Sequence, residues 1–137
     1  MKIFLDTNVL IDIIEHRSGE QAACTIVERY VGAYDRVCVS YLSLANIIYI
    51  LRKQYTESQM RMILGTINSC MTVISGLAQH FYDIQKVAGS DLEDCLQILC
   101  AEYEQCDVIL TRNVKDYIGL TRLPVMTPEE FLGYCRP

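Results

Sequence analysis

Three carboxylates lie at points of the sequence from which they could meet at one site. Asp6 directly follows the apolar stretch KIFL, Asp94 lies in SDLEDCLQILC, and Asp116 lies in TRNVKDY. Like charges a few ångströms apart cannot all stay ionised without a counter-charge, and a divalent cation supplies one. Sites built from carboxylates and water suit Mg²⁺ or Mn²⁺. If the three acids converge, the chemistry that follows is metal-dependent hydrolysis of a phosphodiester.

Each carboxylate also has a simpler structural interpretation. An acid in the position of Asp6 stabilises the N-terminus of the following helix through the helix dipole. Asp12, near the middle of that helix, is expected to face solvent. Asp116 either caps a short turn or joins Asp6, and the sequence leaves both interpretations open. The metal site therefore depends on the elements that carry these residues.

The acids of SDLED are separated by helical phase. The apolar face of this helix is expected to comprise Leu92, Leu96, Leu99 and Tyr103. At about 100° per residue Glu93 falls on the polar face with Gln97, and it is expected to serve only as the capping partner of Ser90. Asp91 falls within the apolar arc, whereas Asp94 falls at its border. A half-buried carboxylate needs a partner, so Asp94 is the better candidate for the site.

Stretches rich in Val and Ile alternate with helical patterns along the chain. We expect strands at 2–5, 36–40, 71–74 and 107–111, with an edge strand at 124–126. We expect helices at 8–16, 20–34, 42–54, 56–70, 75–87, 90–105 and 127–135. Capping boxes mark several helix starts, among them Thr56 with Gln59 and Thr127 with Glu130. This alternation predicts one α/β domain over residues 1–137, with a mostly parallel sheet of four to five strands and helices on both faces.

The carboxyl edge of such a sheet is where ligands bind. Two polar clusters fall there: DTN (residues 6–8) after the first strand, and TRN (residues 111–113), followed by Asp116, after the fourth. Asp6 and the second cluster are therefore expected to be neighbours.

Composition excludes several classes of protein. A net charge of −5 and a sequence pI of about 4.9 argue against a DNA-coating or membrane-surface protein. No run of about 18 apolar residues indicates a membrane span. The seven cysteines include no C-x-x-C pair, and the first apolar run ends at Asp6, too early for a secretory signal. We therefore expect buried, reduced thiols in a cytosolic protein.

Other catalytic classes fit the motifs less well. His16 and His80 are isolated, and the chain has no P-loop and no G-x-S-x-G. A dehalogenase-type phosphatase would want D-x-D after the first strand, where this chain has DTN. A receiver-type phosphoacceptor domain would want an aspartate after the third strand, and MTVISG supplies none.

Four segments together resemble the PIN-domain proteins, close to the VapC-like toxins of toxin–antitoxin pairs. They are FLDTNVLIDII, VSYLSLANIIYILRK, SDLEDCLQILCAEYEQCDVILTRNVKDY and PVMTPEEFL, and they follow one another in the family's order along essentially the whole chain. The resemblance implies an α/β/α sandwich and a magnesium- or manganese-dependent endoribonuclease. It also implies an antitoxin partner and a homodimer.

The resemblance assigns site residues by position. The family's first acid falls on Asp6 and its third on Asp94, which would both bind the metal. The fourth motif falls on Thr111 and Asn113, with Asp116 as the nearby carboxylate.

Basic residues around the fourth motif would serve an acidic protein that binds RNA. Arg112 and Lys115 flank the motif and, with Thr111 and Asn113, are expected to position the substrate. A rim of more distant cations is formed by Arg17, Arg52 and Lys53. Together with a bound metal these charges would engage a few phosphates, preferably of single-stranded or looped RNA.

The chain departs from the family at its second acid. The position in LSLANIIYILRK that aligns with a glutamate is Asn46. Asparagine offers an oxygen to a metal or to water but carries no charge. Two functions follow: a catalytic site that uses Asn46, or a catalytically weak or inactive PIN domain that binds RNA or a protein.

Overall fold

A five-stranded, all-parallel sheet forms the centre of the molecule. The computed structural model describes residues 1–32, 35–87 and 91–135. The strands are β1 (Lys2–Leu5), β2 (Arg36–Ser40), β3 (Thr72–Ile74), β4 (Val108–Leu110) and β5 (Val125–Met126), in the order β3-β2-β1-β4-β5. In the register Ile3 pairs with Val37 on one side and with Val108 on the other. The predicted α/β fold is confirmed, with all five strands present.

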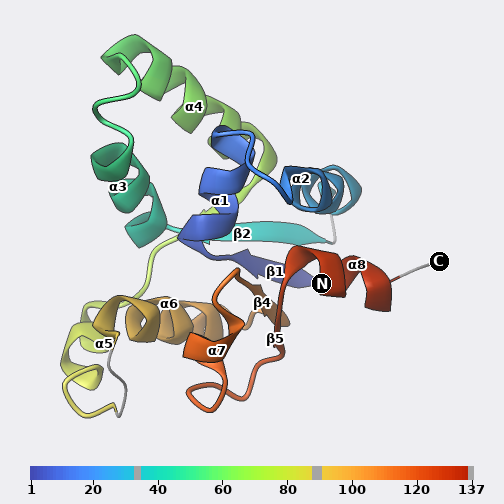
Figure 1. Ribbon diagram of the computed structural model, residues 1–137. Helices are drawn as coiled ribbons and strands as arrows, with labels where there is room; N and C mark the ends of the chain where they lie inside the picture. The colour runs from blue at the N-terminus through green and yellow to red at the C-terminus, as the bar shows by residue number, and fades with distance from the viewer. Residues whose placement is uncertain (33–34, 88–90, 136–137) are drawn as a thin grey trace.

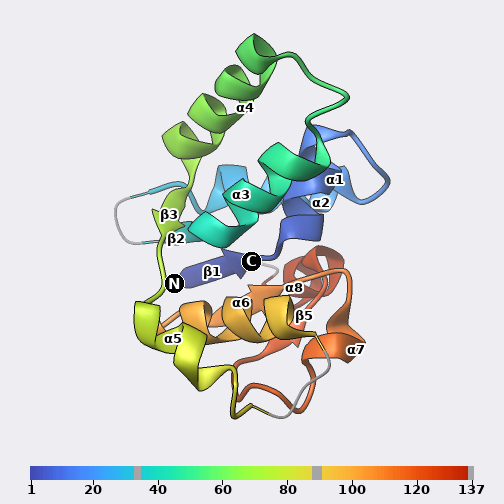
Figure 2. The same ribbon diagram turned by 90° about the vertical axis from the view of Figure 1, so that its left-hand side faces the viewer.

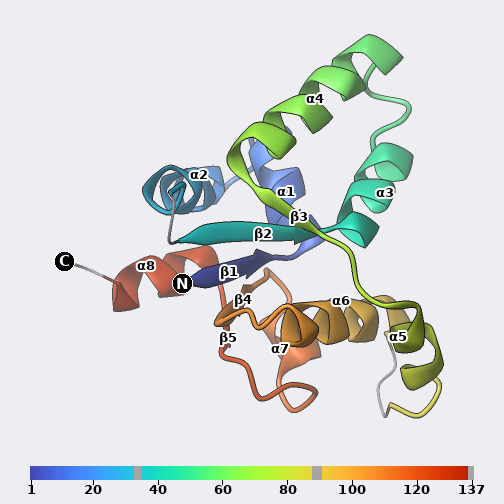
Figure 3. The ribbon, with the colours of Figure 1, turned by 180° about the vertical axis from the view of Figure 1, so that it is seen from behind.

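Helices cover both faces of this sheet (Figure 1). They are α1 (Thr7–Ile14), α2 (Glu20–Arg29), α3 (Tyr41–Ile50), α4 (Glu57–Cys70), α5 (Ala78–Asp83), α6 (Leu92–Tyr103), α7 (Val114–Tyr117) and α8 (Pro128–Tyr134). Helices α1, α2, α3 and α4 lie on one side of β1 and β2, and α5, α6 and α7 lie on the other. Figure 3 shows α3 and α4 extending away from the sheet as a pair.

The alternation of side chains along β1 divides the core into two parts. Ile3 and Leu5 are fully buried in the cluster beneath α1, α2, α3 and α4. Phe4 is fully buried in the cluster beneath α6 and α7. A strand that buries both of its faces must be central, which is why the apolar run KIFL forms β1. Its end therefore lies in the middle of the carboxyl edge.

Local capping motifs place two helix starts where the sequence predicts them. The Thr56 hydroxyl accepts from the amide of Gln59, whose side chain accepts from the amide of Thr56. Thr127 and Glu130 form the same box at the start of α8. Helix α5, in contrast, begins at Ala78 and not at Ser75.

Helix α6 differs from its expected phase. It begins at Leu92, and the Asp91 side chain caps it by accepting from the amide of Asp94 at 3.1 Å. Ser90, the expected cap, lies outside the described residues. Leu92 and Tyr103 are each 53% exposed, whereas Gln97 is fully buried. The expected apolar face was wrong because the sheet contacts a different arc of α6, which carries the buried side chains Cys95, Ile98, Cys100 and Ala101.

The cysteines form no disulfide and the helices are short. All seven thiols are free, and four of them are buried. No helix within the described ranges has both the length and the hydropathy needed to cross a bilayer.

Candidate active site

Asp6 anchors the carboxyl edge of the sheet. Its amide donates to the carbonyl of Leu110 at 3.0 Å, which extends the pairing of β1 with β4 by one residue. Its carboxylate accepts from the amide of Thr7 at 2.7 Å and from the hydroxyl of Thr111 at 2.8 Å. The residue is only 4% exposed, and burial raises the pKa of Asp6 while the bond from Thr111 opposes that rise. The DTN and TRN clusters thus meet, as predicted.

Asp94 approaches Asp6 from the first turn of α6. Burial, followed by the charges of Asp6 and Asp91, raises the pKa of Asp94 to about 6. The charge of Asp6 can act in this way only because the two carboxylates are close in space, although 88 residues separate them in sequence. Asp91, which helical phase placed within the apolar arc, is instead exposed at the cap of α6 and adds a further negative charge.

Tyr117 joins the two acids. Its side chain is fully buried, and its hydroxyl donates to Asp94 at 3.1 Å. Burial and the charges of Asp6 and Asp94 raise the pKa of Tyr117, so the phenol remains a neutral donor. Nothing in the sequence pattern indicated this role beyond the position of Tyr117 directly after Asp116.

Asp116 is placed outside this cluster. It lies on α7 and is exposed, and its amide donates to the carbonyl of Asn113 at 3.0 Å. Asp116 is not among the charges that chiefly raise the pKa of Asp6 or of Asp94. The structure places Asp116 in the short helix α7 but shows no capping bond from its side chain within the described residues, and its part in the site stays a prediction. Lys115 and Asn113 are likewise exposed at this turn, and the amide of Asn113 donates to the hydroxyl of Thr111 at 3.1 Å.

The Arg112 side chain is bonded to residues other than Asp6 and Asp94. Its guanidinium donates to Asp12 at 2.7 Å, to the carbonyl of Gly19 at 3.0 Å and to the carboxylate of Glu129. The expectation that Asp12 faces solvent was wrong, since it is 7% exposed and paired with Arg112. These contacts join α1 to α8. An arginine whose donors are engaged in this way stabilises the fold and is poorly placed to position a substrate.

The more distant cations are all on the surface. Arg17, Arg52 and Lys53 are exposed, and Arg52 stacks over the ring of Tyr49 at 3.9 Å. Among the contacts of the described residues, none joins these three side chains to Asp6.

Asn46 and Glu93 form a pair across the carboxyl edge. The Asn46 amide donates to the Glu93 carboxylate at 2.7 Å, which links α3 to the first turn of α6. Glu93 was expected only to cap α6, and that expectation was wrong. Burial and the charges of Asp6 and Asp91 raise the pKa of Glu93, so its carboxylate shares the electrostatic environment of the cluster. Figure 2 shows α3 and α6 on opposite sides of β1.

A buried network of neutral groups lies behind these acids. The Gln97 side-chain amide donates to Ser43 at 2.7 Å and to Thr7 at 3.2 Å, and its oxygen accepts from Ser40 at 2.5 Å. Thr7 and Ser43 are hydrogen-bonded to each other at 2.8 Å. The network connects α1, α3 and α6, so it fixes the helix that Asp6 caps and the two helices that carry Asn46 and Asp94. Sequence phase had placed Gln97 on the polar surface.

The donor set at this edge fits a hard divalent cation. Asp6 and Asp94 present carboxylate oxygens whose mutual repulsion a cation relieves, and carboxylates with water are ligands that Mg²⁺ and Mn²⁺ accept. The cation would have to draw these ligands inward. Among the residues outside the gaps at 33–34, 88–90 and 136–137, no three Asp, Glu, His or Cys side chains are already assembled as a metal cluster.

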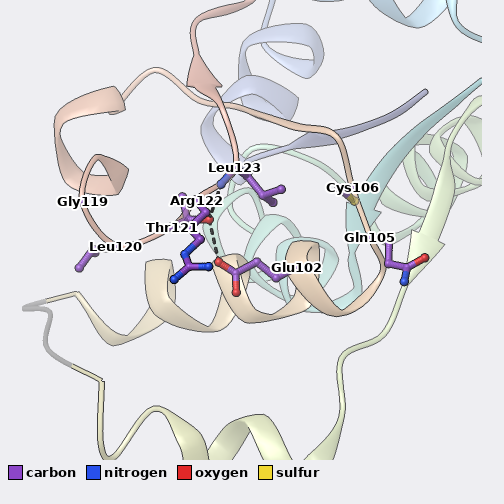
Figure 4. A pocket seen from close by; sticks show the side chains of 8 residues that line it. All are labelled: Glu102, Gln105, Cys106, Gly119, Leu120, Thr121, Arg122 and Leu123. Carbon is purple, nitrogen blue, oxygen red and sulfur yellow. Dashed lines mark hydrogen bonds between the residues drawn. The ribbon is translucent and has the colours of Figure 1, made fainter.

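A separate cavity of about 610 Å³ lies at the other end of α6 (Figure 4). It is lined by the end of α6 and by residues 119–123, and Glu102 accepts a hydrogen bond from Thr121 there at 2.7 Å. None of the acids of the cluster lines it.

The fold and the cluster define a parallel α/β domain with an acidic centre at the carboxyl edge of its sheet. A family model for the PIN domain matches residues 3–116, and the chain belongs to the PIN domain family. The predicted family membership is confirmed.

Individual relatives support this assignment. The chain is 29% identical over 136 residues to Ribonuclease VapC1 of Aquifex aeolicus (strain VF5), which covers 95% of this chain and 92% of that protein. The structure is similar to VapBC-1 from nontypeable Haemophilus influenzae, with a TM-score of 0.76, 20% identity, and coverage of 94% of this chain and 99% of that one. A toxin–antitoxin complex from Klebsiella pneumoniae gives a TM-score of 0.64 at 24% identity, over 92% and 97% of the two chains.

Proposed function

We propose that the protein is a metal-dependent endoribonuclease and the toxin of a toxin–antitoxin pair. The observation that carries the proposal is the convergence of Asp6 and Asp94 at the carboxyl edge, with Tyr117 hydrogen-bonded to one acid and Thr111 to the other. The relative named Ribonuclease VapC1 supports the choice of RNA as substrate.

Two acids would bind the metal, and two hydroxyl groups orient these acids. Asp6 and Asp94 would hold Mg²⁺ or Mn²⁺, which supplies an activated water and shields the charge of the phosphate. Thr111 and Tyr117 orient the two carboxylates by donating hydrogen bonds to them. The exposed residues Lys115 and Asp116 lie on the outer side of the site, where a flexible RNA strand would enter.

The antitoxin partner is proposed to bind a groove on the side of the sheet that α1, α2 and α4 cover. The groove has a volume of about 550 Å³ and is lined by α1, α2, α4 and Tyr55. Apolar side chains such as Ile13, Val27, Ile63 and Ile67 line it, and an amphipathic helix would bury them. A solved structure with this fold, from Klebsiella pneumoniae, is named a toxin–antitoxin complex, which supports an antitoxin as the partner.

A homodimer is proposed through the exposed apolar side chains of α3 and α5. Tyr41 is 68% exposed, and Phe81 and Tyr82 are 66% and 64% exposed. Large exposed aromatic side chains are typical of protein interfaces. Sedimentation of the isolated chain would test this proposal, and a monomer at micromolar concentration would refute it.

A second candidate function is an RNA- or protein-binding module that does not cut. The observation that favours it is Asn46, an uncharged residue beside the acids.

Incubation with RNA separates the two functions. Single-stranded and structured RNAs are incubated with the protein in Mn²⁺, in Mg²⁺ and in EDTA, beside the variants Asp6→Asn and Asp94→Asn. Glu102→Gln is the matched control, since Glu102 is an exposed acid at the far end of α6. Cleavage that needs metal and is lost in both aspartate variants supports the ribonuclease. Cleavage that survives either substitution refutes the site, and binding without cleavage favours the module.

A further inference from the structure

Glu93 is an acid near the proposed metal site that is not one of its two proposed ligands, Asp6 and Asp94. It lies one residue before Asp94 on the first turn of α6, and adjacent positions on a helix point in directions about 100° apart. Asp94 points toward Tyr117 on α7, whereas Glu93 points toward Asn46 on α3. The charge of Asp6 acts on both carboxylates. Glu93 and Asp94 therefore project from one turn of α6 toward two different helices, α3 and α7.

The bond from Asn46 fixes the Glu93 carboxylate in this direction. Only the side-chain nitrogen of asparagine can donate to a carboxylate, and it bonds one oxygen, Oε1, at 2.7 Å. The other oxygen has no hydrogen bond within the described part of the chain. Glu93 is also exposed, so water and a phosphate can reach it.

A purely structural role does not account for this pair. Helices α3 and α6 are already joined, one turn deeper, by the bonds of Gln97 to Ser40 and Ser43. A surface bond adds little to that connection. A tether between the helices would also be better made by a neutral residue, because a charge at position 93 is repelled by Asp6 and Asp91.

We propose that Glu93 is the third carboxylate ligand of the divalent cation, with Asn46 as the residue that positions it. The inference rests on the proposed function, because it concerns the same metal site. In this proposal the third negative charge of the metal site is that of Glu93 on α6. Asn46 on α3 supplies the neutral donor that holds the Glu93 carboxylate in place.

Metal binding without RNA tests this proposal. The affinity for Mn²⁺ is measured by the electron paramagnetic resonance signal of the free ion, with circular dichroism melting as the folding control. Glu93→Gln, which keeps a hydrogen bond to Asn46, should weaken Mn²⁺ binding by about 10-fold or more. Asn46→Ala keeps the charge and should weaken binding by a smaller factor. Glu102→Gln is the matched control: Glu102 also lies on α6 and accepts one side-chain bond, from Thr121 at 2.7 Å.

The exchanged pair is the decisive variant. Asn46→Glu combined with Glu93→Gln preserves an amide–carboxylate bond with donor and acceptor reversed, so the charge returns to the same corner of the site. It should recover most of the Mn²⁺ affinity that Glu93→Gln loses. If the exchanged pair binds Mn²⁺ no better than Glu93→Gln, the placement of the charge is refuted.

The failure of this inference is distinguishable from failure of the proposed function. If Asp94→Asn abolishes Mn²⁺ binding and RNA cleavage while Glu93→Gln leaves Mn²⁺ affinity unchanged, only the role of Glu93 is overturned. If the wild-type protein itself binds no Mn²⁺, both proposals are overturned.

Discussion

Replacing Asp94 with asparagine is expected to stabilise the protein at neutral pH, although the change removes a proposed cation ligand. Burial and the charges of Asp6 and Asp91 raise the pKa of Asp94 to about 6 from an ordinary 3.8. The folded protein therefore binds this proton more tightly than the unfolded chain does. The stability contributed by the protonated form is fully present below about pH 4 and is lost as the pH rises through about 6.

The size of the effect follows from the shift. About two pKa units correspond to about 3 kcal/mol, at 1.36 kcal/mol per unit. Asp94 is only partly buried, so solvent screening reduces the expected gain to about 1–2 kcal/mol. Asparagine keeps an oxygen that can accept the bond from Tyr117 but carries no charge. At about pH 7.5 the midpoint of thermal unfolding should rise by about 3–8 °C.

Thermal unfolding in EDTA checks this prediction. Melting is followed by circular dichroism at about pH 4.5 and about pH 7.5, and the difference between variant and wild type should fall to about one third at the lower pH. Asp83→Asn is the matched control, because Asp83 also accepts one side-chain bond, from Gln79 at 3.2 Å, but lies on α5. A midpoint for Asp94→Asn at or below that of the wild type at the higher pH refutes the reasoning.

Two further predictions concern packing, one in the buried network of Gln97 and one at two glycines. Gln97→Leu should lower the free energy of unfolding in urea by about 2–4 kcal/mol, because Ser40 and Ser43 lose a buried partner; an unchanged value contradicts the role of the network. Gly19→Ala should lower it by about 1–3 kcal/mol, because Gly19 has a φ of +92° and an added Cβ would collide with the guanidinium of Arg112. Gly65→Ala, with open space around its Cβ in α4, should instead raise it by about 1 kcal/mol, and the same sign for both glycines would refute the argument.

The features that the sequence predicted correctly are those that neighbouring residues decide. The apolar run KIFL can form only a strand buried on both faces, and it becomes the central β1. The capping boxes at Thr56 and Thr127 each close within three residues, so their helix starts are correct. The meeting of Asp6 with Thr111 also followed from topology, because parallel strands end at the same edge.

The features that the sequence did not predict depend on how elements rotate against one another. The phase of α6 is set by the arc that faces the sheet, and that arc buries Gln97 and turns Glu93 toward Asn46. The pairing of Asp12 with Arg112 spans 100 residues. No local pattern reports such partners, so an acid that looks solvent-facing in the helix periodicity can be buried in the fold.

Two layers of polar contacts at the carboxyl edge have opposite effects on stability. The inner layer of Thr7, Ser43 and Gln97 is neutral and saturated with hydrogen bonds, so it holds the helices in position. The outer layer of Asp6 and Asp94 consists of acids whose pKa values are raised, chiefly by burial and then by neighbouring negative charges, so their ionised forms destabilise the protein, and a bound cation would relieve this. Because different residues make the two layers, stability and metal affinity should respond to different substitutions. Loss of Gln97 should weaken the fold, whereas loss of the Asp94 charge should strengthen the fold and weaken the binding of metal.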